Sequence, residues 1–129
     1  MSNAAPKKKI LIIDDEKEMV QVETLRLEAY GYEVSVAYDG ESGLARARSE
    51  RPDLIILDIV LPKIGGYELC RMLKQDAACQ RIPIILVSAL DQKYDTDLGK
   101  KVGADDFFTK PFEPRILVDK IKELLRKAV

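Results

Sequence analysis

Apolar residues gather in five short runs along the chain. These runs are KILIID (9–14), EVSVA (33–37), DLIILD (53–58), IPIILVS (82–88) and DDFFT (105–109). The first, third and fourth runs are almost continuously apolar, which is typical of strands buried on both faces of a parallel sheet. The second run alternates between polar and apolar residues, as an edge strand does. The pattern therefore predicts five strands, with the second at an edge of the sheet.

Between these runs, apolar residues recur at the spacing of a helix. The stretch 16–30 predicts a helix that ends before Gly31 and buries an apolar stripe made of Met19, Val22, Leu25 and Ala29. Helices are also predicted over 40–50 and after a loop at 59–66, where the apolar positions are Leu69, Met72 and Leu73. The last helix begins at Pro114, and its stripe is Leu117, Ile121, Leu124 and Ala128.

The helix expected over 93–102 is poorly patterned, because Leu98 and Val102 are its main apolar positions. Gly99 lies inside it and weakens a helix by about 1 kcal/mol relative to Ala. We expect this fourth helix to have low local stability.

Strands that alternate with helices predict an α/β fold, namely a doubly wound, flavodoxin-like, five-stranded parallel sheet with five helices and the strand order 2-1-3-4-5. A chain of 129 residues is the size of one domain. We assign that domain to residues 9–129. Residues 1–8 are polar, and we expect them to be disordered or a remnant of cloning.

The composition argues against several classes of function. The chain has 21 basic and 22 acidic residues, a net charge of −1, and no apolar run near the roughly 20 residues that span a bilayer. We therefore expect a cytoplasmic protein that binds neither nucleic acid nor membrane. Two cysteines, Cys70 and Cys79, are expected to be free thiols. The absence of histidine excludes histidine-based catalysis and removes the usual transition-metal ligand.

Polar side chains follow the central strands at the edge where doubly wound sheets bind their ligands. The first strand ends in Asp14, Asp15 and Glu16, the third in Asp58, the fourth in Ser88, and the fifth in Thr109 and Lys110. Clustered carboxylates repel one another unless they hold a hard cation, and Mg²⁺ is the cation that commonly works beside phosphate. Lys110 and Ser88 can bind phosphoryl oxygens, and a carboxylate can accept a phosphoryl group. Glu16 is interpreted as an acid of the first helical turn.

The chain resembles the receiver domain of two-component response regulators from about residue 8 to residue 127. The motifs that carry the resemblance are IDDE (13–16), IILDIVLP (55–62), LVSA (86–89) and GADDFFTKPF (103–112).

The resemblance implies a role for each of these residues. Asp58 would accept a phosphoryl group from a histidine kinase, a phosphotransfer protein or a small phosphodonor. Mg²⁺ would be bound directly by Asp15, Asp58 and the backbone carbonyl of Val60, with Asp14 acting through water. Ser88 and Lys110 would contact the phosphoryl oxygens, and Ser88 with Phe107 would form the switch.

The resemblance also implies what the domain does with the phosphoryl group. The surface made of the fourth helix, fifth strand and fifth helix would signal to an output domain or partner, or pair two copies. The domain would be no enzyme beyond its own phosphorylation and dephosphorylation.

Two departures from the commonest family pattern are present. The switch aromatic is Phe107 where Tyr is frequent. Val60 and Leu90 are both apolar and flank the route of an attacking water, so we expect slow autodephosphorylation.

One alternative stays open, namely a receiver fold that acts as a phosphorylation-independent interaction module. A phosphatase of the haloacid dehalogenase type is disfavoured, because IDDE lacks the Asp-x-Asp spacing. A flavodoxin that binds FMN is disfavoured because three acids would repel its phosphate.

Overall fold

The computed structural model describes residues 6–89 and 94–127. Its five strands are β1 (Lys9–Ile13), β2 (Glu33–Ala37), β3 (Leu54–Asp58), β4 (Ile84–Ala89) and β5 (Asp106–Lys110). They form one parallel sheet in the order β2-β1-β3-β4-β5, so the predicted order is confirmed. The helices are α1 (Lys17–Ala29), α2 (Gly40–Glu50), α3 (Gly66–Gln75), α4 (Thr96–Lys101) and α5 (Pro114–Lys127).

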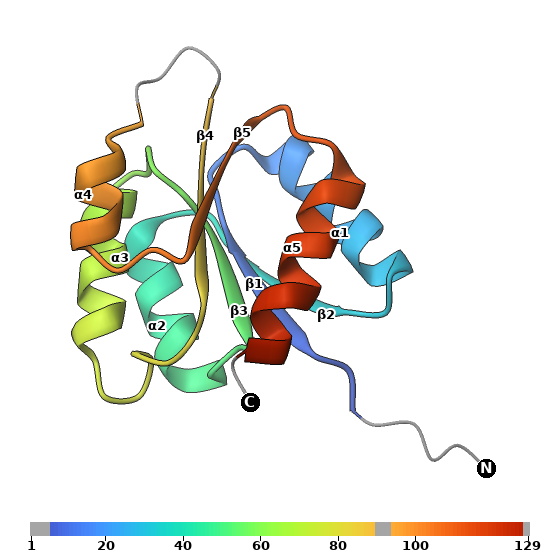
Figure 1. Ribbon diagram of the computed structural model, residues 1–129, viewed down its shortest axis with the longest axis horizontal. Helices are drawn as coiled ribbons and strands as arrows, with labels where there is room; N and C mark the ends of the chain where they lie inside the picture. The colour runs from blue at the N-terminus through green and yellow to red at the C-terminus, as the bar shows by residue number, and fades with distance from the viewer. Residues whose placement is uncertain (1–5, 90–93, 128–129) are drawn as a thin grey trace.

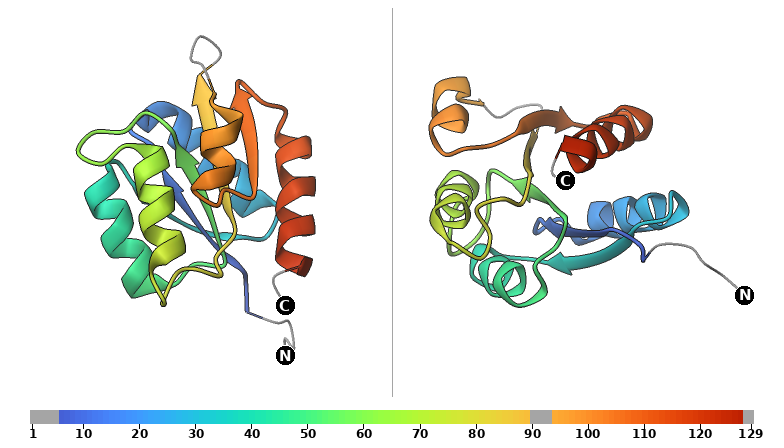
Figure 2. Two further views of the ribbon diagram at one scale, coloured as in Figure 1. Left: turned by 60° about the vertical axis from the view of Figure 1, so that its left-hand side comes forward. Right: turned by 60° about the horizontal axis from the view of Figure 1, so that its bottom comes forward.

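The sheet lies between two layers of helices (Figure 1). Helices α2, α3 and α4 cover one face, and α1 and α5 cover the other, as the turned views in Figure 2 also show. Strand β3 is buried along its whole length, whereas β2 is partly exposed at the sheet edge, as predicted. Side chains of one strand alternate between the two faces. Leu57 of β3, for example, packs in the α2–α3–α4 core, and Ile56 packs in the α1–α5 core.

Capping residues set where some helices begin and end. Asp39 precedes α2, and its carboxylate accepts a hydrogen bond of 2.7 Å from the backbone N–H of Ser42. After α1, Gly31 has a φ of 96°, a conformation that favours glycine, which explains why the helix ends there.

The predicted buried stripe of α1 is wrong. Val22 is 45% exposed and Leu25 is 68% exposed, while the residues of α1 that are buried are Val20 and Leu27. Apolar residues occur around much of this helix, so spacing alone selects no face. Packing against the sheet and α5 decides the face, and it buries Val20 and Leu27 with Ile10, Ile12 and Leu117.

Helix α4 is shorter than predicted. It begins after Asp95, whose carboxylate caps the N–H of Leu98 at 3.0 Å, and Gly99 is its buried residue. Residues 90–93 and 128–129 lie outside the described part of the chain, and with them Leu90 and Ala128. Within 6–89 and 94–127, no helix is long and apolar enough to cross a membrane.

Candidate functional site

Four polar side chains are buried at the carboxyl ends of strands β1, β3, β4 and β5. Asp14 follows β1, Asp58 is the last residue of β3, Ser88 lies near the end of β4, and Lys110 is the last residue of β5. None is more than 4% exposed. Parallel strands deliver all four to the same edge of the sheet, which places these residues, distant in sequence, around one point.

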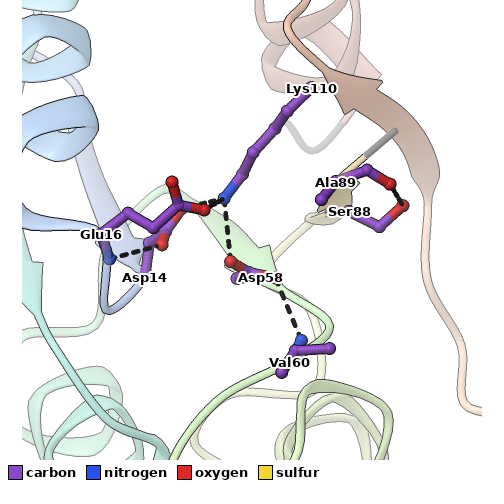
Figure 3. Close-up of polar contacts among 7 residues, drawn as sticks. All are labelled: Asp14, Glu16, Asp58, Val60, Ser88, Ala89 and Lys110. Atoms are coloured by element: carbon purple, nitrogen blue, oxygen red, sulfur yellow. Dashed lines mark hydrogen bonds and ion pairs between the residues drawn. The ribbon is translucent and has the colours of Figure 1, made fainter. Parts of the chain in front are cut away.

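The ammonium group of Lys110 lies among three carboxylates (Figure 3). Its Nζ donates hydrogen bonds to Asp14 Oδ2 at 2.7 Å, Asp58 Oδ2 at 2.8 Å and Glu16 Oε1 at 3.1 Å. The side chains of Asp14 and Asp58 are each 6% exposed, whereas that of Glu16 is 52% exposed. The arrangement is a buried ion pair shared by two aspartates and bordered by a third, solvent-facing acid.

The backbone around Asp58 holds its carboxylate in place. Asp58 Oδ1 accepts a hydrogen bond of 3.0 Å from the N–H of Val60, so each oxygen of the carboxylate has a donor. The loop after β3 is tied to β4 through the N–H of Ile59 and the carbonyl of Val87 at 2.9 Å. Gly66 begins α3 against this loop, where a Cβ would collide with the carbonyl oxygen of Asp58.

Burial and pairing shift two of these pKa values. Burial raises the pKa of Asp14, against the lowering effect of its hydrogen bond from Lys110, and the nearby charge of Asp58 raises it further. Burial by itself lowers the pKa of Lys110, but hydrogen bonds to Asp14 and Asp58 outweigh it, so the pKa of Lys110 is raised. Lys110 is therefore a permanent cation at neutral pH, while the negative charge of Asp14 is held at an energetic cost.

The acidic cluster has the chemistry of a hard-metal site. Asp14, Glu16 and Asp58 each offer a carboxylate oxygen, and these oxygens lie within 4.8 Å of one another. Oxygen donors with excess negative charge suit Mg²⁺. Three carboxylates around one ammonium leave a net negative charge, which a bound cation would offset. The residues present therefore fit a magnesium ion.

The other predicted site residues are Asp15, Ser88 and Phe107, and each lies in different surroundings. Asp15 is exposed, next to the cluster in sequence. The Ser88 hydroxyl donates to the carbonyl of Ala89 at 3.5 Å, on the strand beside Asp58. Phe107 is half-buried on the α3–α4 side of the sheet, where its ring stacks on Tyr94 with centroids 3.6 Å apart.

Sequence reasoning missed the contact between Glu16 and Lys110. Glu16 precedes α1, and its backbone N–H donates to Asp14 Oδ1 at 3.0 Å, while its carboxylate reaches Lys110. Three consecutive acids after a buried strand were a signal of this contact. Glu16 is both the acid that precedes the first turn of α1 and a carboxylate that contacts Lys110. The sequence alone does not distinguish these two roles.

Comparisons with known proteins identify the family of this chain. Residues 10–122 match the family described as "Response regulator receiver domain". The alkaline phosphatase synthesis transcriptional regulatory protein PhoP of Bacillus subtilis is 45% identical over 121 residues, which are 94% of this chain and 50% of that protein. The chain thus spans about half the length of the curated relatives it matches.

Solved structures show the same fold. A putative response regulator from Chloroflexus aurantiacus is 35% identical with a TM-score of 0.88, over 94% of this chain and 99% of that one. The receiver domain of a Pseudomonas aeruginosa sensor histidine kinase, with a magnesium ion in its active-site cleft, is 27% identical with a TM-score of 0.85, over 93% of this chain and 98% of that one. The chain belongs to the receiver domains of two-component response regulators, a family whose role is to be phosphorylated on an aspartate.

Proposed function

We propose that Asp58 is the phosphoacceptor of this domain. The observation that carries the proposal is the buried contact of 2.8 Å between Asp58 Oδ2 and Lys110 Nζ, at the end of the central strand β3. Receiver domains of response regulators interact with histidine kinases. We therefore expect the donor to be a phosphohistidine of a kinase or phosphotransfer protein, or a small phosphodonor.

The two oxygens of Asp58 are held differently, which suggests the course of the transfer. Val60 N–H is fixed in the backbone and stays with Oδ1, whereas Lys110 has a flexible side chain and can follow the incoming phosphoryl oxygens. Oδ2 is then free to form the new O–P bond. The P–N bond of the donor histidine breaks, and its imidazole nitrogen keeps the electron pair. Lys110 compensates the charge of the transferred group.

Mg²⁺ would be held at the same edge by Asp14, Asp15, Asp58 and the carbonyl of Val60, with Asp14 acting through water. When bound, it would neutralise negative charge on the phosphoryl oxygens. Support comes from the oxygen-rich cluster and from the magnesium ion in the Pseudomonas receiver domain. Glu16 borders the same space and is a further carboxylate within reach.

Ser88 and Phe107 would form the switch. The Ser88 hydroxyl would move toward a phosphoryl oxygen, and the side chain of Phe107, on the neighbouring strand β5, would change position in response. The surface of α4, β5 and α5 would then act on an output domain, a partner or a second copy. Apart from catalysing its own phosphorylation and dephosphorylation, the domain would have no enzymatic activity. The free, buried thiols of Cys70 and Cys79 suit a reducing compartment and support a cytoplasmic location.

The test is intact-mass spectrometry after incubation with acetyl phosphate. Wild type with Mg²⁺ is expected to gain about 80 Da, the mass of one phosphoryl group. The gain should disappear without Mg²⁺ and in Asp58→Asn, which keeps the shape of the side chain and removes its nucleophilic charge. Asp119→Asn, at an exposed position of α5, is the matched control and should be phosphorylated like wild type.

Absence of the adduct from the wild type under every condition would overturn the proposal. It would leave the fold in place and favour the phosphorylation-independent interaction module. An adduct that persists in Asp58→Asn would show that another residue is the acceptor.

A further inference from the structure

Three aromatic rings form a column between β5 and the helices on one face of the sheet. Phe107 of β5 stacks on Tyr94 with ring centroids 3.6 Å apart and planes inclined by 11°. Tyr67 of α3 continues the column, its ring centroid 6.2 Å from that of Tyr94. All three pack against the core cluster beneath α2, α3 and α4. Tyr94 is the middle member and contacts both neighbours.

Tyr94 also fits against α4. The end of its ring occupies the space that a side chain at Gly99 would need, since a Cβ there would lie 2.9 Å from Tyr94 Cζ and collide with the hydroxyl. Gly99 is the buried residue of α4. The ring of Tyr94 is therefore the group on which the buried face of this short helix rests.

The start of α4 is held by the same column. The backbone N–H of Asp95 donates to Tyr67 Oη at 2.9 Å, and the Asp95 carboxylate caps the N–H of Leu98 at 3.0 Å. With six residues, α4 has little stability of its own, because isolated short helices are marginal in water. Its position depends on the side chains that hold it.

Strand β5 connects this column with the acidic site. Phe107 lies three residues before Lys110 on β5, where it pairs in register with Leu86, and Lys110 pairs with Ala89. Lys110 Nζ contacts Asp58 at 2.8 Å. A continuous set of contacts thus leads from Asp58 through Lys110, β5 and Phe107 to Tyr94, and from Tyr94 to Gly99.

We propose that Tyr94 is a positioning residue that couples Phe107 to helix α4. When Lys110 and the end of β5 respond to a phosphoryl group on Asp58, the stacked ring of Tyr94 passes the displacement to the Gly99 face of α4. This inference rests on the proposed phosphorylation of Asp58. In this proposal, the ring of Tyr94 is the side chain through which phosphorylation changes the position of α4.

The test measures phosphorylation and the response of α4 separately. Intact mass gives the phosphorylated fraction with acetyl phosphate and Mg²⁺, and ¹H–¹⁵N NMR gives the amide shifts of residues 96–101 in the same samples. In wild type, and in Tyr94→Phe, which keeps the stacked ring, phosphorylation is expected to shift these amides. In Tyr94→Ala the shift should be lost while the phosphorylated fraction stays at the wild-type level.

Gly99→Ala provides a second variant that does not remove the aromatic side chain. Alanine favours a helix more than glycine does, so this change does not weaken α4 intrinsically, yet its Cβ displaces the ring of Tyr94. The amide response should again be lost, and adding Tyr94→Phe should restore part of it by removing the hydroxyl that collides. Tyr30→Ala, at a tyrosine that is 48% exposed at the end of α1, is the control and should respond like wild type.

The outcomes separate this inference from the proposed function. A full α4 response in Gly99→Ala, or in a folded Tyr94→Ala, at wild-type phosphorylation overturns the coupling role of Tyr94 and leaves Asp58 as the acceptor. The same holds if wild type is phosphorylated and the amides of 96–101 do not move. No adduct in wild type overturns the proposed function itself.

Discussion

At the scale of single residues, the charge balance of the site depends on Lys110. One buried ammonium faces two buried carboxylates and a third at the surface. A carboxylate buried without a cation is unfavourable, because burial removes its hydration and like charges repel. Lys110 therefore stabilises the resting domain as well as serving the chemistry that we propose.

The first prediction concerns Lys110→Met in magnesium-free buffer. Removing one partner of a buried ion pair typically costs about 3–5 kcal/mol, so the free energy of unfolding in urea should fall by an amount of this order. Added Mg²⁺ should restore part of the loss, because it replaces positive charge. Lys120→Met, whose ion pairs with Asp106 and Glu123 are at the surface, should change stability by no more than about 1 kcal/mol. Equal losses in the two variants would contradict this view of the site.

The second prediction concerns the lifetime of the phosphoryl group. Val60 is 53% exposed beside Asp58, and an apolar side chain there gives an attacking water no hydrogen-bonding partner. Val60→Asn should shorten the lifetime of the phosphorylated state, followed by intact mass after removal of acetyl phosphate. The same change at Ile116, which is 55% exposed on α5, should leave the lifetime unchanged. A Val60→Asn lifetime equal to that of wild type would rule out this explanation of slow dephosphorylation.

At the scale of elements, the sequence pattern predicted the strands but not the buried face of α1. Strands such as β3 were predictable, since a run of apolar residues between charged ones allows few other structures. The buried face of α1 was not predictable, because Val22 and Leu25 compete with Val20 and Leu27 for the interior, and only the docked sheet selects between them.

The third prediction compares two leucines of this helix. Leu27 is 1% exposed and Leu25 is 68% exposed. Leu27→Ala should lower the free energy of unfolding by about 2–5 kcal/mol, since it removes buried methyl groups and leaves a cavity. Leu25→Ala should change it by no more than about 0.5 kcal/mol. Urea denaturation of both variants checks this, and comparable losses would mean that the other face of α1 is buried in solution.

The candidate site was also predictable only in part. Asp14, Asp58 and Lys110 were found because each stands at the end of a strand, and strand order alone brings them together. The contact of Glu16 with Lys110 and the stacking of Phe107 on Tyr94 were not found, because both depend on how side chains pack across elements. Strand order is therefore easier to predict from sequence than contacts between side chains of different elements.

The fourth prediction concerns local stability. Helix α4 has six residues and one buried position, whereas α5 has fourteen residues and buries Leu117, Val118, Ile121 and Leu124. Amide hydrogens of α4 should therefore exchange with solvent much faster than those of α5 at the same pH and temperature. Equal protection of the two helices would show that α4 opens only with the whole domain.

At the scale of the whole molecule, the core contains two built-in reporters of unfolding. Cys70 and Cys79 are free and 0% exposed. Burial raises the pKa of Cys70 to about 12 and also raises that of Cys79. At pH 8, a pKa of about 12 leaves roughly one thiol in ten thousand as the reactive thiolate.

The fifth prediction follows from this burial. A thiol reagent at pH 8 should leave both cysteines unmodified in the folded domain and modify both once urea unfolds it. The labelling rate should rise with urea in parallel with the fraction unfolded, as followed by intact mass. Rapid labelling of either thiol without denaturant would indicate that the core opens locally around it.

Helix α5 runs from the site edge of the sheet back toward the opposite edge, where β1 begins (Figure 1). Its fourteen residues correspond to about 21 Å at 1.5 Å per residue. The screening length in physiological salt is about 8 Å, so the electric field of a phosphoryl group on Asp58 is strongly attenuated over that distance. At the far end of α5, near residue 127, the added charge would therefore have little direct effect, and displacement of the packed elements between is the route by which phosphorylation would reach that end of the molecule.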